Sequence, residues 1–191
     1  NAPVTAAQIA ADIGSGLAKA AIAAVVNGEN WDINRVINVD SEIRLITFKD
    51  DYSLELIRHD CAHILAEAVL ELFPETQVTI GPAIETGFYY DFYRKSPFST
   101  DDLATIEQRM HEIVDRDEEI TRGEWSREEA IRFYKDRNEP FKIELVDAIP
   151  EKETVSYYQQ GNFIDLCRGP HMVSTKKVGH AFKLMKVAGA Y

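Results

Sequence analysis

Cysteine is scarce in this chain, with only two residues among 191. Two cysteines cannot build the dense disulfide framework that stabilises many small secreted domains. The sequence also has no recognisable signal peptide, and no apolar run reaches the length of about eighteen residues typical of a membrane-spanning helix. We therefore expect a reducing, soluble, cytoplasmic setting and no membrane partner.

Basic residues are also in short supply. Lys and Arg number 21 against 32 Asp and Glu, which gives a formal net charge of −11 at pH 7. This excludes a general coat for nucleic acid, because phosphate binding depends mainly on Lys and Arg. The stretch from Arg168 to Tyr191 differs, since it holds five Lys or Arg residues and no acidic one. An anionic polymer would meet the protein there, although the same pattern suits a solvated basic edge strand.

Apolar residues, by contrast, make up 45% of the chain, enough for one or two domains with real cores. Residues 1–48 predict a small α+β module. It begins with a capping box at Thr5 and Gln8, and it contains the hairpin turn Asn27-Gly28. The charged residues 49–51 are the expected linker. The chain begins with Asn1 rather than Met, and we expect it to be cut from something longer.

Residues 50–191 predict a second α+β region with a mixed sheet. Its centre is a long helix over residues 52–73, ended by Pro74. Two further helices begin near Ser99 and at the capping box that starts with Ser126. Short strands are expected at residues 77–83, 88–93, 141–145, 155–158, 163–166 and 181–187.

Two histidines lie four residues apart on the long helix. His59 and His63 therefore share one face, with roughly 5–6 Å between their Cβ atoms. Cys61 falls on the main apolar stripe and is expected to be a small buried side chain. A second motif runs from Asp165 to His171 at the end of a strand. Its Gly-Pro pair forbids a helix, so Cys167 and His171 are expected on a bent loop.

Several chemistries fit these side chains. His59, His63, Cys167 and His171 make a complete tetrahedral zinc set. Position 60 is Asp, one methylene shorter than the Glu of zinc proteases, which disfavours that class. Cys167 could instead be a nucleophile with a histidine base. A third hypothesis is a metal-free hydrolytic pocket in which the imidazoles, Asp165 and a Lys orient water. A satisfied polar cluster without any reaction also fits the spacing.

Five motifs in order then resemble the threonyl-tRNA synthetases of bacteria and organelles. They are His59-x-Cys-Ala-His63, Ile80-Gly-Pro82, Gly87-Phe-Tyr-Tyr-Asp91, Asp165-Leu-Cys-Arg-Gly-Pro-His171 and the stretch from Phe182 to Tyr191. The resemblance implies that residues 1–48 are a TGS-like module, truncated at its start. It implies that residues 50–191 are the editing domain that alanyl-tRNA synthetases share. The aminoacylation domain, with its ATP and zinc sites, would be absent.

The resemblance further implies a proofreading deacylase that hydrolyses the ester of seryl-tRNA for threonine. Serine lacks only a methyl group relative to threonine, and a difference of that size gives limited discrimination at a synthesis site, so a second site is expected. The implied partner is the acceptor end of this tRNA carrying serine. The full-length enzyme is expected to be a homodimer through the missing domain.

The resemblance also assigns roles by position. The implied catalytic set is His59, His63, Lys142, Cys167 and His171, and the implied substrate-binding residues are Tyr90, Asp165 and Arg168. His59 and Lys142 would activate or orient water, while the others position the amino acid and terminal adenosine. The side chains of His59, Tyr90 and Lys142 are expected to face a cleft, so their substitution should affect folding little.

The preferred version of this site needs no cofactor. The alternatives are a zinc hydrolase of the alanyl type, with zinc on His59, His63, Cys167 and His171, and a non-catalytic tRNA-binding module.

Overall fold

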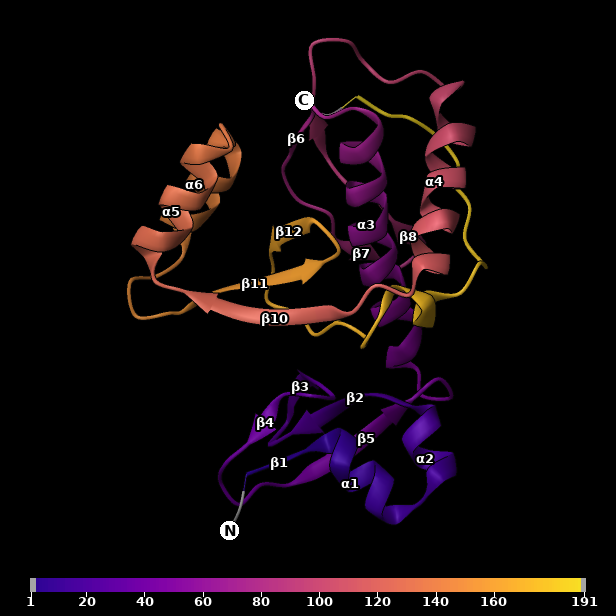
Figure 1. Cartoon of the computed structure of the whole chain (residues 1–191), viewed down its shortest axis with the longest axis vertical. Coiled ribbons are helices and arrows are strands. Elements are labelled where there is room, and N and C mark those ends of the chain that lie inside the picture. The colour runs from indigo at the N-terminus through magenta and orange to yellow at the C-terminus, as the bar shows by residue number, and fades with distance from the viewer. Residues whose placement is uncertain (1–2, 190–191) are drawn as a thin grey trace.

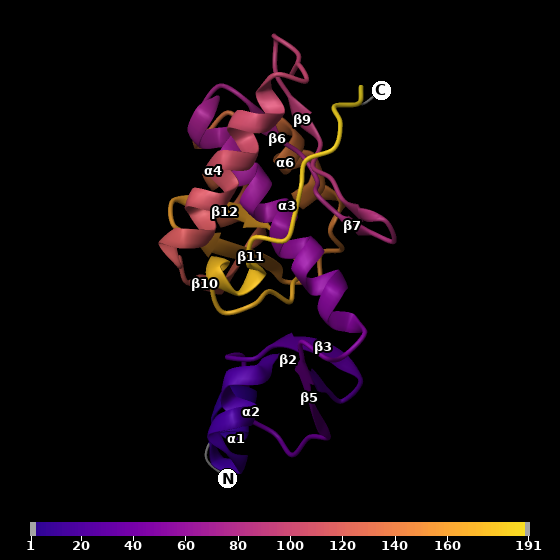
Figure 2. The ribbon, with the colours of Figure 1, turned by 90° about the vertical axis from the view of Figure 1, so that its right-hand side faces the viewer.

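Two α+β regions lie one after the other along the longest axis of the molecule (Figures 1 and 2). The computed structural model describes residues 3–189. The α+β class expected from the sequence is confirmed. Within the described residues, no helix is long and apolar enough to cross a membrane.

The N-terminal module contains two short helices and two small antiparallel sheets. One sheet has the order β3-β2-β5 and the other pairs β1 with β4. Both halves of the expected capping box at Thr5 and Gln8 are formed, and Asn27 and Gly28 join β2 to β3 with positive φ angles of 51° and 86°. Positive φ at both positions suits a two-residue hairpin turn. The elements are β1 (Val4–Thr5), α1 (Ala6–Ile13), α2 (Ser15–Ala20), β2 (Ala21–Val26), β3 (Glu29–Asp32), β4 (Val36–Ile37) and β5 (Ile43–Thr47).

The long helix α3 (Tyr52–Leu72) is the centre of the larger region, as expected. Every residue from 60 to 69 is buried, which requires neighbours on all sides of the helix. Cys61 is buried as predicted, whereas Leu54 is half exposed. Leu54 lies in the first turn, near the link between the two regions, where α3 is not yet surrounded. Ile46 of β5 joins the same apolar cluster as Leu56, so the core crosses this link. The division into 1–48 and 50–191 stays a prediction.

A three-stranded antiparallel sheet, β10-β11-β12, lies beside α3. All pairings between the described strands are antiparallel, so the expected mixed sheet is not found. The elements after α3 are β6 (Gln77–Val78), β7 (Ala83–Ile84), β8 (Gly87–Phe88), β9 (Phe92–Tyr93), α4 (Asp102–Arg116), β10 (Ile120–Trp125), α5 (Arg127–Asp136), α6 (Pro140–Ala148), β11 (Val155–Gln160), β12 (Phe163–Leu166) and a 3-10 turn (Thr175–Val178).

The segment predicted as a strand at 141–145 is instead part of helix α6. Its alternating apolar and polar residues fit a strand, but Pro140 occupies the first turn of the helix, where its fixed φ is favourable. Packing then decides, because Val146 is buried with Tyr134 of α5 in a separate apolar cluster. Lys142 is therefore carried by a helix rather than by a strand.

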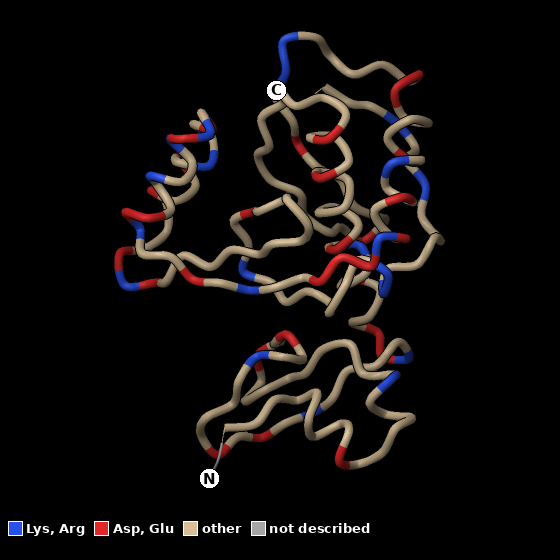
Figure 3. Tube along the Cα trace, in the orientation of Figure 1, with Lys and Arg blue, Asp and Glu red and all other residues tan. Residues whose placement is uncertain are grey.

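The basic C-terminal stretch is not an edge strand. Residues 181–187 form no strand but extend along α4, where the Leu184 backbone N–H donates to Glu107 at 2.7 Å. Two of its basic residues form ion pairs with acidic residues. Lys176 lies 3.8 Å from Asp117, and Lys183 lies 3.9 Å from Glu107. Figure 3 shows both signs of charge interspersed over this part of the molecule. The last two residues of the Phe182–Tyr191 motif lie outside the described part.

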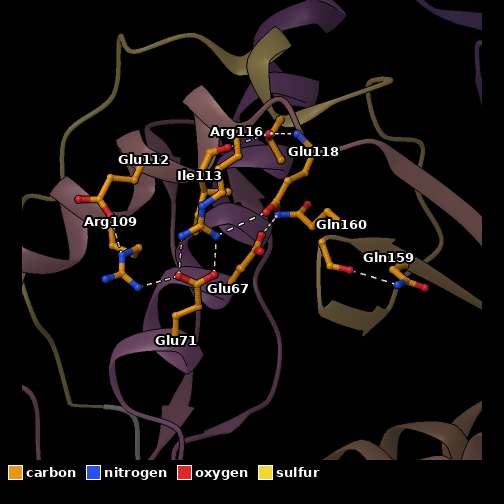
Figure 4. Close-up of polar contacts among 11 residues, drawn as sticks. Glu67, Glu71, Arg109, Glu112, Ile113, Arg116, Glu118, Gln159 and Gln160 are labelled. Atoms are coloured by element: carbon orange, nitrogen blue, oxygen red, sulfur yellow. Dashed lines mark hydrogen bonds and ion pairs between the residues drawn. The ribbon is translucent and has the colours of Figure 1, made fainter.

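Polar side chains join α3 to α4 and to the sheet (Figure 4). Glu71 pairs with Arg109 at 2.7 Å and with Arg116 at 2.5 Å. One helical turn away, buried Glu67 accepts a hydrogen bond of 2.7 Å from the Gln160 side chain. Burial, followed by the nearby Glu118 carboxyl group, raises the pKa of Glu67 to about 8. This shift favours the protonated form of Glu67 in the folded protein at neutral pH.

We expect Glu67→Gln to stabilise the protein at pH 8 more than at pH 5. The pKa of Glu67 is higher in the folded protein than in the unfolded chain. Between about pH 4.5 and about pH 8, Glu67 therefore ionises in the unfolded chain but not in the folded protein, so the wild type loses stability as the pH rises. Gln copies the protonated carboxyl group and cannot ionise. The gain should grow by on the order of 1 kcal/mol per pH unit in this window. Urea unfolding of both proteins at the two pH values measures it, and a gain independent of pH would contradict it.

Candidate functional site

Four side chains from two distant segments meet at one point. His59 and His63 come from α3, while Cys167 and His171 come from the loop after β12. The Cys167 Sγ atom lies 3.2 Å from His59 Nε2 and 3.3 Å from His171 Nε2. One nitrogen or sulfur atom from each of the four residues lies within 4.8 Å of all the others. The structure thus brings together the four residues that the two motifs singled out.

Asp60 is a member of this site that sequence reasoning missed. Its carboxylate is fully buried, 2.7 Å from His171 Nδ1, and accepts a 3.1 Å hydrogen bond from the Met172 backbone N–H. The contact fixes the His171 ring with Nδ1 toward Asp60 and Nε2 toward Cys167. The available signal was an acidic residue inside a stretch of helix expected to be buried, because such a group needs a partner.

A buried network of Lys142, Asp165 and Tyr90 lies at the end of β12 that leads into the Cys167 loop. The Lys142 ammonium group pairs with Asp165 and donates to the Thr79 carbonyl at 2.6 Å and to the Tyr90 hydroxyl at 3.1 Å. Tyr90 in turn donates to Asp165 at 2.5 Å. Lys142 is only 1% exposed, so the expectation that it faces a cleft is wrong. Helix α6 inserts this side chain into the interior, where only a paired charge is tolerated.

Burial sets the protonation states in the cluster. It lowers the pKa of His59 and of His171 to about 4, and it lowers the pKa of His63 well below its usual range. Burial also raises the pKa of the Cys167 thiol to about 12. At neutral pH the site therefore holds three neutral imidazoles and a protonated thiol. Neutral imidazoles accept protons, whereas a protonated thiol is a poor nucleophile.

The same donor set fits a zinc ion. Three neutral imidazoles and one thiol, which a metal would deprotonate, supply the nitrogen and sulfur ligands and the count of four that tetrahedral zinc takes. The carboxylate behind His171 is also the kind of outer partner that orients a metal-binding histidine. The four residues could thus hold zinc as well as serve a metal-free pocket.

A shallow pocket of about 230 Å³ reaches Cys167 from the surface. Ile80, Ser156 and Leu166 help to line it, and Arg168 lies at its rim. The Arg168 side chain is 82% exposed and pairs with Glu153 at 3.2 Å. Of the expected substrate-binding residues, Tyr90 and Asp165 lie in the buried network, whereas Arg168 is exposed and pairs with Glu153.

Known proteins match both regions of the chain. The TGS domain family matches residues 2–47, and the family described as threonyl and alanyl tRNA synthetase second additional domain matches residues 155–189. Threonine–tRNA ligase of Paramagnetospirillum magneticum is 59% identical over 190 residues, and those of Granulibacter bethesdensis and Acidiphilium cryptum are 56% and 57% identical over 191 and 189 residues.

These alignments cover 99–100% of this chain but only 30% of each relative. The resemblance drawn from the five sequence motifs is thus confirmed. Nearly the whole chain corresponds to one region of the threonyl-tRNA synthetases, a region that contains a TGS domain and a threonyl and alanyl tRNA synthetase second additional domain.

Proposed function

We propose that this region proofreads, by hydrolysing the ester that links serine to the tRNA for threonine. The observation that carries the proposal is the convergence of three neutral imidazoles and a thiol beside a buried Lys142–Asp165 pair. Neutral imidazoles are suited to accept a proton from water, and polar groups held rigidly by a buried network are suited to position an ester. For the full-length enzyme, of which this chain covers only one region, we further propose that it aminoacylates the tRNA, forms a homodimer and is located in the cytoplasm.

In the proposed reaction, His59 accepts a proton from a water molecule as the water oxygen bonds to the ester carbonyl carbon. The bond from this carbon to the ribose oxygen then breaks, and the ribose oxygen takes up the proton held by His59, which releases serine and free tRNA and leaves His59 neutral. Lys142 fixes Asp165 and Tyr90, and so sets the polar wall of the site. Cys167 has a positioning role, because its protonated thiol is unsuited to attack. An acid quench during turnover should therefore trap no serine thioester.

The chain should cleave seryl-tRNA and spare threonyl-tRNA. An extra methyl group in a close-packed site typically costs about 1–3 kcal/mol, which corresponds to roughly tenfold to more than a hundredfold in rate. Incubation with each pre-formed ester, with release of the free amino acid followed over time, tests the proposal. Equal cleavage of both esters would contradict the proposed selectivity, and binding without any cleavage would favour the non-catalytic tRNA-binding module instead.

We expect the purified chain to carry less than one equivalent of zinc, because the substrate has to enter among the same four side chains. Elemental analysis after purification without added metal measures the content, and chelator treatment measures its effect on ester cleavage. One tightly held zinc whose removal abolishes cleavage would support the alternative, a zinc hydrolase of the alanyl type. The donor set of His59, His63, Cys167 and His171 is the observation that keeps this alternative open.

A further inference from the structure

Asp32, the last residue of β3 in the N-terminal module, contacts the loop that carries Cys167 and His171. One carboxylate oxygen accepts a 2.8 Å hydrogen bond from the His171 backbone N–H. The other accepts a 2.7 Å hydrogen bond from the Tyr158 hydroxyl. A single side chain of the first module thus joins two segments of the larger region, in the area where β3 faces the β10-β11 sheet (Figure 1).

Tyr158 supports the same loop from β11. It is 2% exposed, and its ring centroid lies 4.3 Å from that of His171. At Gly169, which has a φ of +70°, a Cβ atom would lie only 1.9 Å from the Tyr158 hydroxyl. The loop therefore passes directly over the hydroxyl group that Asp32 holds in place.

His171 is consequently held by two carboxylates from different parts of the chain. Asp60 of α3 binds the imidazole, and Asp32 binds the backbone of the same residue. These contacts together fix the position and the orientation of the ring that faces Cys167. Because the two acids accept hydrogen bonds from different parts of the same residue, the two contacts together restrict the loop more than either would alone.

Packing around the contact is incomplete. A pocket of about 370 Å³ adjoins it, lined by residues 32–36 of the N-terminal module, 119–122 of β10 and its approach, and 171–173 of the loop. Val173 packs against the apolar cluster of the module, but the space beside it is open. If the Asp32 contact were lost, water could therefore reach the loop, because no tight apolar packing would hold the loop in its place.

We propose that Asp32 is a positioning residue of the hydrolytic site, so that the N-terminal module completes a pocket whose reacting groups all belong to the larger region. The role in ester cleavage rests on the proposed function. The mechanical part, that Asp32 holds the loop with Cys167 and His171, does not depend on it. The hydrogen bonds of Asp32 reach the backbone of His171 and the Tyr158 hydroxyl rather than the imidazole or the thiol. The Asp32 charge also acts on the imidazole through space, where it opposes the lowering of the His171 pKa by burial.

Amide hydrogen exchange over residues 167–173 tests the mechanical part in Asp32→Ala, Asp32→Asn and the control Asp12→Ala, which removes an exposed carboxylate of the same module. Exchange should rise about tenfold to a hundredfold in Asp32→Ala, because a charged acceptor is lost. Asp32→Asn keeps one acceptor oxygen, so its exchange rate should lie between those of the wild type and Asp32→Ala. Alkylation of Cys167 should accelerate in the same order, while buried Cys61 serves as an internal reference.

Seryl-tRNA cleavage by the same variants tests the role in the reaction. The expected result is a kcat lowered about tenfold or more with KM little changed. Unchanged exchange in Asp32→Ala would overturn the proposal outright. Faster exchange with an unchanged kcat would overturn the positioning role in the reaction. If the wild type itself cleaves no ester, the proposed function fails, and the exchange and alkylation rates still decide whether Asp32 holds the loop.

Discussion

Replacing His59 by alanine should slow cleavage of seryl-tRNA by about 100- to 10,000-fold, the range that a positioned general base commonly contributes. His59 is the one histidine of the cluster that remains partly exposed, and its Nε2 atom lies 3.2 Å from Cys167 Sγ. Its lowered pKa of about 4 keeps the ring neutral at pH 7 and so free to accept a proton, but it also makes the imidazole a weaker base, which favours the lower end of this range. Folding should change little, because a partly exposed side chain leaves no sealed cavity behind.

His111→Ala is the matched control for this prediction. His111 lies on α4, and its Nδ1 atom is 2.9 Å from that of His180. His111 itself is remote in sequence from both site motifs, 48 residues after His63 and 54 residues before Asp165. First-order rates at saturating seryl-tRNA for the two variants give the comparison, and a melting curve of each confirms folding. Full activity in His59→Ala would refute its proposed role.

The elements with strong local signals could be predicted from the sequence. The capping boxes at Thr5 and Ser126, the turn at Asn27-Gly28 and the central helix all depend on residues close together in the chain. The strands around Thr86 could not be placed well, because β6 to β9 have only two residues each. Strand pairs this short are specified by the surface of α3 beneath them more than by their own alternation.

Prediction of the site divides in a similar way. The approach of Cys167 and His171 to His59 and His63 was expected through the family resemblance. The contacts of Asp60 and Asp32 with the His171 segment were not, because each joins residues more than 100 positions apart and neither acid belongs to a pattern with its partner. Such contacts are set by the tertiary fold. Composition and periodicity do not predict which two distant residues will touch.

Replacing Lys142 by methionine should destabilise the protein by about 3–5 kcal/mol, the usual cost of breaking a buried ion pair by removing one partner. The side chains of Lys142 and Asp165 are 2% and 4% exposed. Without the ammonium group, Asp165 keeps the hydrogen bond from the Tyr90 hydroxyl but remains a buried charge without its counter-ion. Urea unfolding of Lys142→Met, Asp165→Asn and the double variant measures the change.

The double variant distinguishes an uncompensated charge from simple loss of packing. With both charges removed, Lys142→Met/Asp165→Asn should be at least as stable as the less stable single variant, since no buried charge is left without its partner. Arg168→Ala is the control from the adjoining loop, because it breaks an exposed pair with Glu153 and should cost less than about 1 kcal/mol. Purely additive losses would mean that the two charges do not stabilise each other. In that case the polar wall of the proposed site would be held by Tyr90 and the Thr79 carbonyl rather than by the ion pair.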